Sequence, residues 1–355
     1  FASTTQGGSL YTWGTKAAGL GTQFRSTSLE LGVPALVDGF NNNVAKIAMG
    51  PNHSALITTD GDLYTFGFCQ HGVLGHNERA TSRVEPCIVD YFKEHNIKLR
   101  DVVVGEYHTA AVTTNDQIYT WGYGGKSYNP ISNLLSSSYG ALGLGKQVST
   151  YLPSLIEDWN GGKIAQITSG NNFIAVLTES GEFYNWGVGK HGVFADDVEK
   201  NLKAPTLNDA VHHLTEEKGI KPIKIKASGD SILVLFDNGS LYGWGYNDLG
   251  QLGVKKEMGV EYYKVIEHPT KIDDANLKGK KIVDFDIGED ISAILTESGE
   301  VYWAGLKLVY QPQLVDFPEG VKIKKIAVAN PTILAISENG QVHTNRRLTP
   351  KDLTD

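Results

Sequence analysis

The sequence contains little cysteine and little methionine, with two residues of each among 355. Cys69 and Cys87 are too few for a disulfide scaffold and lack the paired spacing of a zinc site. We therefore expect reduced thiols and no structural metal. The chain begins with Phe1 rather than methionine, which predicts that this N-terminus has been processed or trimmed.

Long apolar runs and clusters of basic residues are also missing. The longest apolar runs, such as residues 232–236, have the length of a strand and are far too short to cross a membrane. The net charge is −8, and no Lys/Arg cluster extends beyond short pieces such as residues 278–281. A phosphate backbone would be repelled by this balance, which argues against a nucleic-acid partner.

Catalytic motifs do not stand out in the sequence. We find no Ser-His-Asp order, no phosphate-binding glycine loop with its lysine and no paired catalytic carboxylates. His212 and His213 are adjacent, and they are interpreted as part of a helix rather than as metal ligands. The sequence therefore predicts a protein that is not an enzyme and that holds no cofactor or metal.

Glycine, in contrast, is abundant at 40 residues and marks a unit that recurs about every 50 to 65 residues. Each unit has a glycine-led strand that ends in a small apolar run, a tight turn, and an aromatic-rich strand that ends in Trp-Gly. Copies begin at Gly50, Gly105, Gly170, Gly229 and Gly288, and a worn copy covers residues 330–343.

Each unit is predicted to be a β-hairpin, because apolar residues alternate with Thr and Ser up to dipeptides such as Asp60-Gly61. Such dipeptides supply the positive φ angles of two-residue hairpin turns. A lone hairpin cannot bury its apolar face, so the units must stack in a line or in a ring. A ring is favoured, because residues 8–14 form the aromatic half of a unit and residues 333–340 the glycine-led half. Pairing of these terminal strands would remove both free edges.

The units resemble the regulator of chromosome condensation repeat family. The best-preserved tail, residues 241–253, reads Leu-Tyr-Gly-Trp-Gly-Tyr-Asn-Asp-Leu-Gly-Gln-Leu-Gly, and looser tails lie at residues 71–75 and 139–143. The resemblance covers roughly residues 8–345 and implies an all-β fold, a β-propeller of typically seven four-stranded blades closed by pairing of the N- and C-terminal strands. A strict count of the repeats gives six blades. We predict one β-propeller domain over residues 1–355.

Several aromatic side chains recur at one place in the unit and are expected to serve the repeat. His53 and His108 share one position and are expected to be held in blade packing by hydrogen bonds, with Phe173, Ile232 and Ile291 as their equivalents. The tryptophans that share a second position are expected to be wedges between blades, and they are Trp13, Trp121, Trp186 and Trp244.

Three insertions depart from the repeat, near residues 124–139, 196–218 and 255–264. The first is the leading candidate for a protein-binding surface, with a self-packed Ω-loop as the alternative. The second contains a predicted helix over residues 207–219. The second and third insertions could each dock a partner helix or loop, or could instead cover a blade edge. The candidate partner contacts are Lys126, Tyr128, Ile131, Leu134, Leu135, Tyr139, Tyr262 and Tyr263.

The sequence thus favours a protein–protein interaction or assembly scaffold, such as a subunit or assembly factor of a large complex. The resemblance implies an alternative, guanine-nucleotide exchange, because founding members act on the small GTPase Ran through a propeller face and a projecting β-wedge. Residues 1–5, Phe-Ala-Ser-Thr-Thr, resemble the start left by removal of a mitochondrial targeting peptide. We therefore expect a mitochondrial location, with cytoplasm or nucleus as alternatives.

Overall fold

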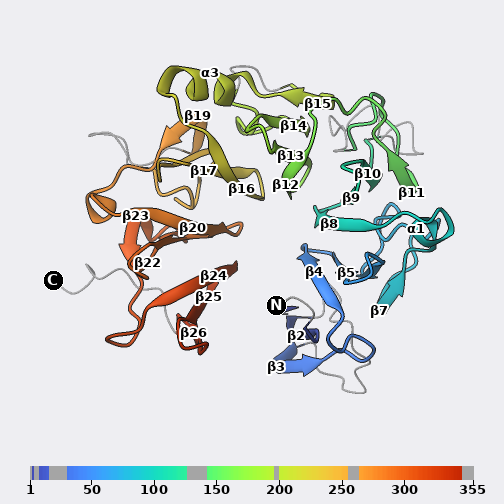
Figure 1. Cartoon of the computed structure of the whole chain (residues 1–355), viewed down its shortest axis with the longest axis horizontal. Coiled ribbons are helices and arrows are strands. Elements are labelled where there is room, and N and C mark those ends of the chain that lie inside the picture. Colours follow the sequence, from blue (N-terminus) through green and yellow to red (C-terminus); the bar gives the residue numbers. More distant parts are fainter. Residues whose placement is uncertain are drawn as a thin grey trace. The chain divides into compact units, whose positions relative to one another are not determined.

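A computed structural model of the chain describes residues 2–3, 8–15, 30–125, 142–195, 200–254 and 264–345. The strands of these residues form seven antiparallel sheets (Figure 1). The contacts divide the chain into two compact units, which are described separately, so the single domain stays a prediction. The first unit comprises Phe1–Glu179, Tyr184–Val188 and Asn201–Thr206, and the second comprises Ser180–Phe183, Gly189–Lys200 and Leu207–Asp355.

The first unit contains four sheets, in the orders β1-β2-β3, β4-β5-β6-β7, β11-β10-β9-β8 and β12-β13-β14-β15. A short helix, α1 (Asp90–Glu94), connects the second sheet to the third. The strands are β1 (Ala2–Ser3), β2 (Tyr11–Thr15), β3 (Glu30–Leu36), β4 (Val44–Met49), β5 (His53–Thr58), β6 (Leu63–Gly67), β7 (Arg83–Ile88), β8 (Leu99–Val104), β9 (His108–Thr113), β10 (Ile118–Gly122), β11 (Thr150–Leu155), β12 (Ile164–Ser169), β13 (Phe173–Thr178), β14 (Phe183–Gly187) and β15 (Leu202–Leu207).

The second unit contains three sheets, in the orders β16-β17-β18-β19, β20-β21-β22-β23 and β24-β25-β26. Its helices are α3 (Asp209–Lys218) and the short 3₁₀-helix η2 (Ala275–Leu277). The strands are β16 (Pro222–Ser228), β17 (Ser231–Phe236), β18 (Leu241–Tyr246), β19 (Val265–Lys271), β20 (Ile282–Ile287), β21 (Ile291–Thr296), β22 (Val301–Gly305), β23 (Val309–Leu314), β24 (Ile323–Ala329), β25 (Thr332–Ser337) and β26 (Val342–Thr344).

The glycine-led strands of the sequence are the most buried strands of the sheets. Every residue of β5, β9, β13, β17 and β21 is buried. Each of these strands lies inside its sheet, with one neighbour on either side, and it packs both of its faces against other apolar side chains. The alternation of Ala, Val and Ile with Thr and Ser therefore marks strands whose small hydroxyl side chains are buried along with the apolar ones.

The turns between the second and third strands hold one more residue than predicted. In the β5–β6 hairpin, Ile57 pairs with Leu63, the Thr58 N–H donates to the Asp62 carbonyl at 3.0 Å, and three residues remain as the loop. Gly61, the last of the three, has φ +80° and donates to the Thr58 carbonyl. A type I turn followed by a left-handed residue needs glycine at its third position, and this explains the Asp-Gly dipeptide better than a two-residue turn.

The two chain ends belong to different units, so their pairing with each other stays a prediction, and the described strands show only how each end pairs within its own unit. β2 pairs with β1 and β3, whereas β25 pairs with β24 and β26. Each terminal half unit therefore belongs to a sheet of its own unit. The seven sheets of the described residues agree with the number of blades implied by the family resemblance.

The outer strands share a proline that sequence analysis did not use. Six of the twelve prolines lie in the last strand of a sheet, at equivalent places. Those in β3, β7, β11, β19 and β23 come directly before a residue that pairs with the neighbouring aromatic-rich strand. Proline has no N–H to donate, so it blocks the addition of a further strand to an edge. These residues are Pro34, Pro86, Pro153, Pro205, Pro269 and Pro312.

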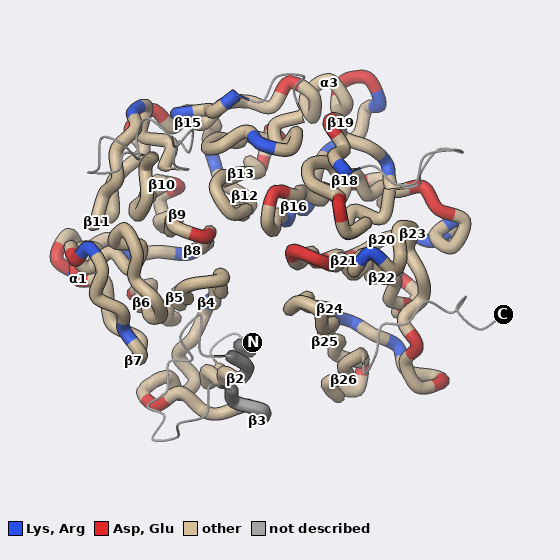
Figure 2. The backbone as a smooth tube through the Cα atoms, turned by 180° about the vertical axis from the view of Figure 1, so that it is seen from behind, with Lys and Arg blue, Asp and Glu red and all other residues tan. Residues whose placement is uncertain are grey.

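Inner strands of neighbouring sheets are joined by ion pairs within each unit. Lys46 on β4 lies 2.8 Å from Asp101 on β8, and Lys226 on β16 lies 3.3 Å from Asp286 on β20. These side chains are partly exposed, so each pair contributes little stability, about 0 to 1 kcal/mol. Figure 2 shows the basic and acidic positions along the backbone.

The helix predicted over residues 207–219 is confirmed as α3. The Asn208 side chain caps its first turn by accepting a hydrogen bond from the Val211 N–H, and Gly219 ends it with a left-handed φ of 62°. The preceding residues Leu202–Leu207 form β15, the fourth strand of its sheet. The region near residues 196–218 therefore contains a framework strand as well as the predicted helix.

Tryptophans of one sheet hold the loop that follows the third strand of the preceding sheet. The Trp121 indole N–H donates to the Val73 carbonyl at 2.8 Å, and the Trp244 indole donates to the Val193 carbonyl at 3.0 Å. The backbone of Gly75 packs closely against the Trp121 indole. A Cβ atom at position 75 would lie only 2.9 Å from the indole nitrogen, which leaves no room for a side chain. The small residue at the end of each tail therefore makes room for the next tryptophan.

We predict that Gly75→Ala destabilises the protein more than Gly39→Ala. Both glycines have positive φ, +78° and +84°, so the backbone strain is matched. Gly39 has open space around it, whereas a methyl group at Gly75 would displace Trp121. The expected difference in the free energy of unfolding is about 1 to 3 kcal/mol, measured by urea denaturation. Equal losses in the two variants would contradict the packing role of Gly75.

Candidate functional site

The eight predicted partner contacts lie outside the described residues. Residues 126–141 and 255–263 carry all of them, and the described chain resumes at Leu142 and Lys264. Their role stays a prediction. The described residues that flank the first insertion, however, belong to a surface that can be built in detail.

The tryptophans of the repeat lie at equivalent positions in the third strands. Trp121, Trp186 and Trp244 are completely buried, and Trp13 on β2 is half-buried. Strand register places Phe66 and Ala304 at the same position, because each pairs with the second residue of its neighbouring strand. These side chains form the packing of the sheets and are not available to a partner.

The two repeat histidines are buried, and each forms a hydrogen bond with a hydroxyl group of the next sheet. The His53 Nε2 lies 2.7 Å from the Thr109 hydroxyl, and the His108 Nε2 lies 2.8 Å from the Ser169 hydroxyl. Because the Thr109 hydroxyl donates its only proton to the Val73 carbonyl, it accepts from His53, which fixes the proton on Nε2. Register also corrects one predicted equivalent: Ser231, not Ile232, pairs with Gly245 as His53 pairs with Gly67.

Burial lowers the pKa of both histidines to about 3, and for His53 the neighbouring His108 lowers the pKa further. The Nδ1 atom of His53 is buried without a hydrogen-bond partner, so a second proton would place an uncompensated charge in the interior. Both rings are therefore neutral structural groups at physiological pH and do not act as bases or ligands.

A cluster of aromatic rings lies on the surface of the first unit, in the loops next to Gly67 and Gly122, the last residues of β6 and β10. We define the aromatic patch as His71, Tyr107 and Tyr123. The His71 ring lies edge-on to Tyr107, with centroids 5.7 Å apart, and tilted against Tyr123 at 4.6 Å. His71 is exposed and the two tyrosines are half-buried, so all three rings present part of their surface to solvent.

Main-chain hydrogen bonds and one side-chain hydrogen bond, from Asn52, fix the loops that carry the aromatic patch. The Tyr123 N–H donates to the Tyr107 carbonyl at 2.7 Å, which joins the loop after β10 to the turn before β9. The Asn52 side chain donates to the Glu106 carbonyl at 3.0 Å, and the Phe68 N–H donates to the Asn52 carbonyl at 2.8 Å. The rings are thus held before any partner arrives, which lowers the entropy lost on binding.

A second copy of this arrangement occurs in the second unit. His191 has the same left-handed backbone as His71, with φ of 54° and 56°, and its ring lies 4.8 Å from that of Tyr246. Asp230 takes the place of Tyr107 and contacts the His191 Nδ1 at 2.7 Å. The same framework therefore carries an aromatic group in one copy and a carboxylate in the other, which makes this position variable in chemistry.

The chemistry of the aromatic patch suits contact rather than proton transfer. Burial lowers the pKa of His71, with a further decrease from Arg79, so its ring is neutral near pH 7. Burial and the Glu106 carboxylate raise the pKa of Tyr107, so its hydroxyl stays protonated. Rigid aromatic rings with polar edges are the groups that contribute most to protein interfaces. Sequence analysis missed this patch, although the His-Gly dipeptide recurs at residues 71–72 and 191–192.

Neither a metal site nor a membrane span is found in the described part of the chain. No three side chains of His, Cys, Asp or Glu gather there in a way that could hold a metal ion. Among the same residues, no helix has the length and apolar character needed to cross a bilayer.

Residues 9–345 match the family model of the RCC1-like domain. The chain belongs to the RCC1-like domain family. RCC1-like domains are protein-interaction domains and are generally non-catalytic. The predicted family and the all-β propeller fold are thereby confirmed.

Relatives with this domain are proteins of varied function. Ultraviolet-B receptor UVR8 of Arabidopsis thaliana is 28% identical over 255 residues, which cover 71% of this chain and 52% of UVR8. The mitochondrial RCC1 domain-containing protein RUG3 of the same plant is 27% identical over 288 residues, covering 78% and 57%. Human E3 ubiquitin-protein ligase HERC2 is 27% identical over 250 residues, covering 70% of this chain and 5% of HERC2. The chain thus spans about half the length of the plant relatives.

Solved structures of RCC1-like propellers share the fold of this chain. Yeast RCC1 (Prp20), in a complex with Kap60, has a TM-score of 0.77 at 19% identity, covering 96% of this chain and 79% of Prp20. Human WBSCR16 has a TM-score of 0.73 at 18% identity, covering 94% and 87%. RCC1 has seven blades, the number of sheets found in the described residues of this chain.

We predict that acidification from pH 7 to pH 5 destabilises the protein through His53 and His108. The folded pKa of each ring is about 3, below the value of 6.5 expected when unfolded, so the unfolded chain binds more protons between these limits. Stability therefore falls as the pH drops below 6.5, by about 2 kcal/mol per histidine at pH 5. Urea denaturation at both pH values should show a smaller pH effect for the His53→Asn/His108→Asn variant, whereas the variant of exposed His268, His268→Asn, should behave like wild type.

Proposed function

We propose that this RCC1-like domain is a non-enzymatic assembly scaffold that binds a protein partner through the aromatic patch of His71, Tyr107 and Tyr123. The observation that carries the proposal is the combination of partial exposure and rigidity at these three rings. Their loops are joined by main-chain hydrogen bonds, and their side chains pack on one another. A partner gains aromatic contact area there without having to order the loops.

The position of the aromatic patch supports the same proposal. Tyr123 lies two residues after Trp121, and the sequence after it continues into the insertion near residues 124–139. The predicted contacts of that insertion, which carry apolar side chains, would extend an interface that begins at the aromatic patch. Yeast RCC1 (Prp20) is named with Kap60, Gsp1p and histones as binding partners, so protein binding is a property of a propeller with this fold.

The relatives also bear on the location of the protein. RUG3, a relative that matches 78% of this chain, is described as mitochondrial. This supports the proposal that the scaffold acts in mitochondria as part of a larger complex. The alternative activity, guanine-nucleotide exchange on a small GTPase, stays a prediction from the family resemblance.

The proposed partner site is tested with the His71→Asn/Tyr123→Ser variant. Asparagine tolerates the left-handed backbone of position 71, so the loop keeps its shape while both rings are lost. Quantitative affinity capture from the native source should recover the stoichiometric partner with wild type and lose it with the variant. Thermal unfolding of both proteins shows whether the fold is intact.

The equivalent substitutions in the second unit provide the control. His191→Asn/Tyr246→Ser removes the same atoms at the same places of the repeat. We expect this variant to retain the partner. A first-unit variant that unfolds like wild type and still captures its partner in full would refute the proposed site, as would equal losses in the two double variants.

A further inference from the structure

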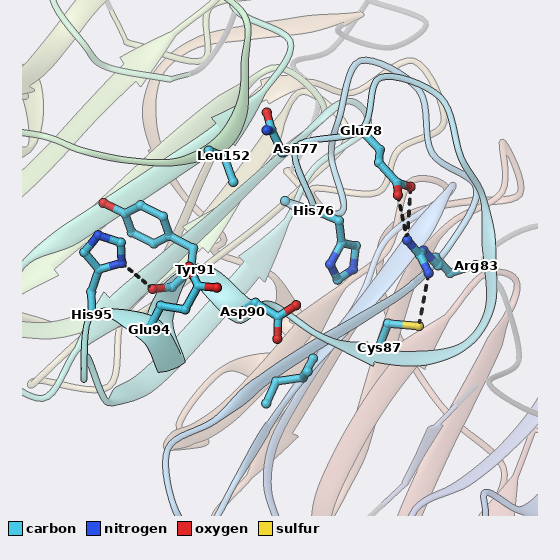
Figure 3. A pocket seen from close by; sticks show the side chains of 12 residues that line it. His76, Asn77, Glu78, Arg83, Cys87, Asp90, Tyr91, Glu94, His95 and Leu152 are labelled. Carbon is cyan, nitrogen blue, oxygen red and sulfur yellow. Dashed lines mark hydrogen bonds and ion pairs between the residues drawn. The ribbon is translucent and has the colours of Figure 1, made fainter.

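A cavity of about 680 Å³ lies beside α1 in the first unit (Figure 3). Its volume is within the range of side-chain and small-molecule sites. We define the α1 cavity by six of its lining residues that carry the argument: Glu78, Arg83, Asp90, Tyr91, Glu94 and Leu152. None of them belongs to the aromatic patch.

The guanidinium of Arg83, which lines the α1 cavity, is already paired with a carboxylate. Both oxygens of the Glu78 carboxylate lie 3.0 Å from the Arg83 Nη2. The other terminal nitrogen of Arg83 points to the Cys87 sulfur at 4.0 Å (Figure 3). Arg83 and Glu78 therefore neutralise each other, and this pair contributes no net charge to the cavity.

Two other carboxylates of the cavity form no hydrogen bond or ion pair in the described part of the chain, and one of them, Asp90, interacts electrostatically with His76, whose pKa burial lowers. Asp90 and Glu94 are four residues apart on α1, so their side chains lie on the same face of the helix. Both are exposed, and neither forms a hydrogen bond or an ion pair among the described residues. Figure 2 shows acidic positions at α1. The cavity thus carries two uncompensated negative charges on one wall.

Flat and apolar groups lie next to these carboxylates. The Tyr91 ring is stacked on the His95 ring, with centroids 4.3 Å apart and an angle of 25° between the planes. The His95 Nδ1 donates to the Tyr91 carbonyl at 2.7 Å, which holds the stacked pair on the helix. Leu152, from β11 of the adjoining sheet, is 36% exposed and lines the same cavity. An aliphatic stem and a planar cation would both find matching surfaces here.

We infer that the α1 cavity binds an arginine side chain of a protein partner. The guanidinium donates to the Asp90 and Glu94 carboxylates, its plane packs on the Tyr91 ring, and its stem contacts Leu152. Arginine fits better than lysine, because its planar fork pairs with carboxylates and stacks on aromatic rings, whereas an ammonium is a compact, strongly hydrated charge. The inference rests on the proposed function in one respect, that the arginine belongs to a protein, but the site is separate from the aromatic patch.

The inference is tested by ligand-observed NMR titration of the whole chain with the peptide acetyl-Gly-Arg-Gly-amide. The matched probe is acetyl-Gly-citrulline-Gly-amide, which has nearly the same shape without the charge, and a third peptide carries lysine. We expect binding in the order arginine, lysine, citrulline. The Asp90→Asn/Glu94→Gln variant should bind the arginine peptide roughly tenfold more weakly, and Tyr91→Leu should reduce the preference for arginine over lysine.

The control for total charge is Glu157→Gln/Asp158→Asn, which removes two exposed carboxylates elsewhere in the same unit. This variant should bind the arginine peptide like wild type. Equal affinity of wild type for the arginine and citrulline peptides would overturn the inference, as would equal losses in the two double variants. The aromatic-patch variant His71→Asn/Tyr123→Ser should bind the peptide normally, so failure of the proposed partner site and failure of this inference give different results.

Discussion

The carbonyl of Val73, in the loop after β6, holds the sheet β4-β5-β6-β7 against the sheet β11-β10-β9-β8 in the first unit. It accepts hydrogen bonds from the Trp121 indole and from the Thr109 hydroxyl, both at 2.8 Å, and both donors belong to the next sheet. The Thr109 hydroxyl in turn accepts a hydrogen bond from the His53 Nε2 on β5. A buried carbonyl has two lone pairs, and here both are used. A loop that would otherwise be a surface connection is thereby part of the core.

This constraint explains why the repeat retains some residues and varies others. The tryptophan, the small residue at the end of the tail and the buried histidine act together, because each fills space or supplies a hydrogen bond that the others require. Residues beside them, such as Tyr107 and its counterpart Asp230, have side chains that contact a histidine of the neighbouring loop. Tyr107 also packs on the buried Cys69, Val73 and Leu74. The two counterparts differ between the units, and this difference alters the chemistry offered to a partner.

The sequence was sufficient to predict the framework and insufficient for the surfaces. Long, ordered motifs predicted the β-propeller and its buried strands, and the spacing of apolar residues over 207–214 with Gly219 as the stop predicted α3. Short strands such as β1 were not predicted, because they carry too few residues to show a pattern. The recurring proline of the outer strands was a usable signal for the last strand of six of the seven sheets of the described residues. The aromatic patch could not be predicted in the same way, because its rings come from three separate loops that only the register of the strands brings together.

The two candidate surfaces of the first unit differ in the contacts that they offer, and this difference limits the kind of partner that can use both. The aromatic patch is neutral, because the pKa of His71 is lowered and that of Tyr107 is raised. The α1 cavity is acidic, because Glu78 neutralises Arg83 and leaves Asp90 and Glu94 uncompensated. β7 connects the two regions: Arg83, its first residue, pairs with Gly67 near the patch, and Ile88, its last, precedes α1. A partner that spans this strand would combine apolar side chains at one end with an arginine at the other, and the arginine would fix its direction on the propeller.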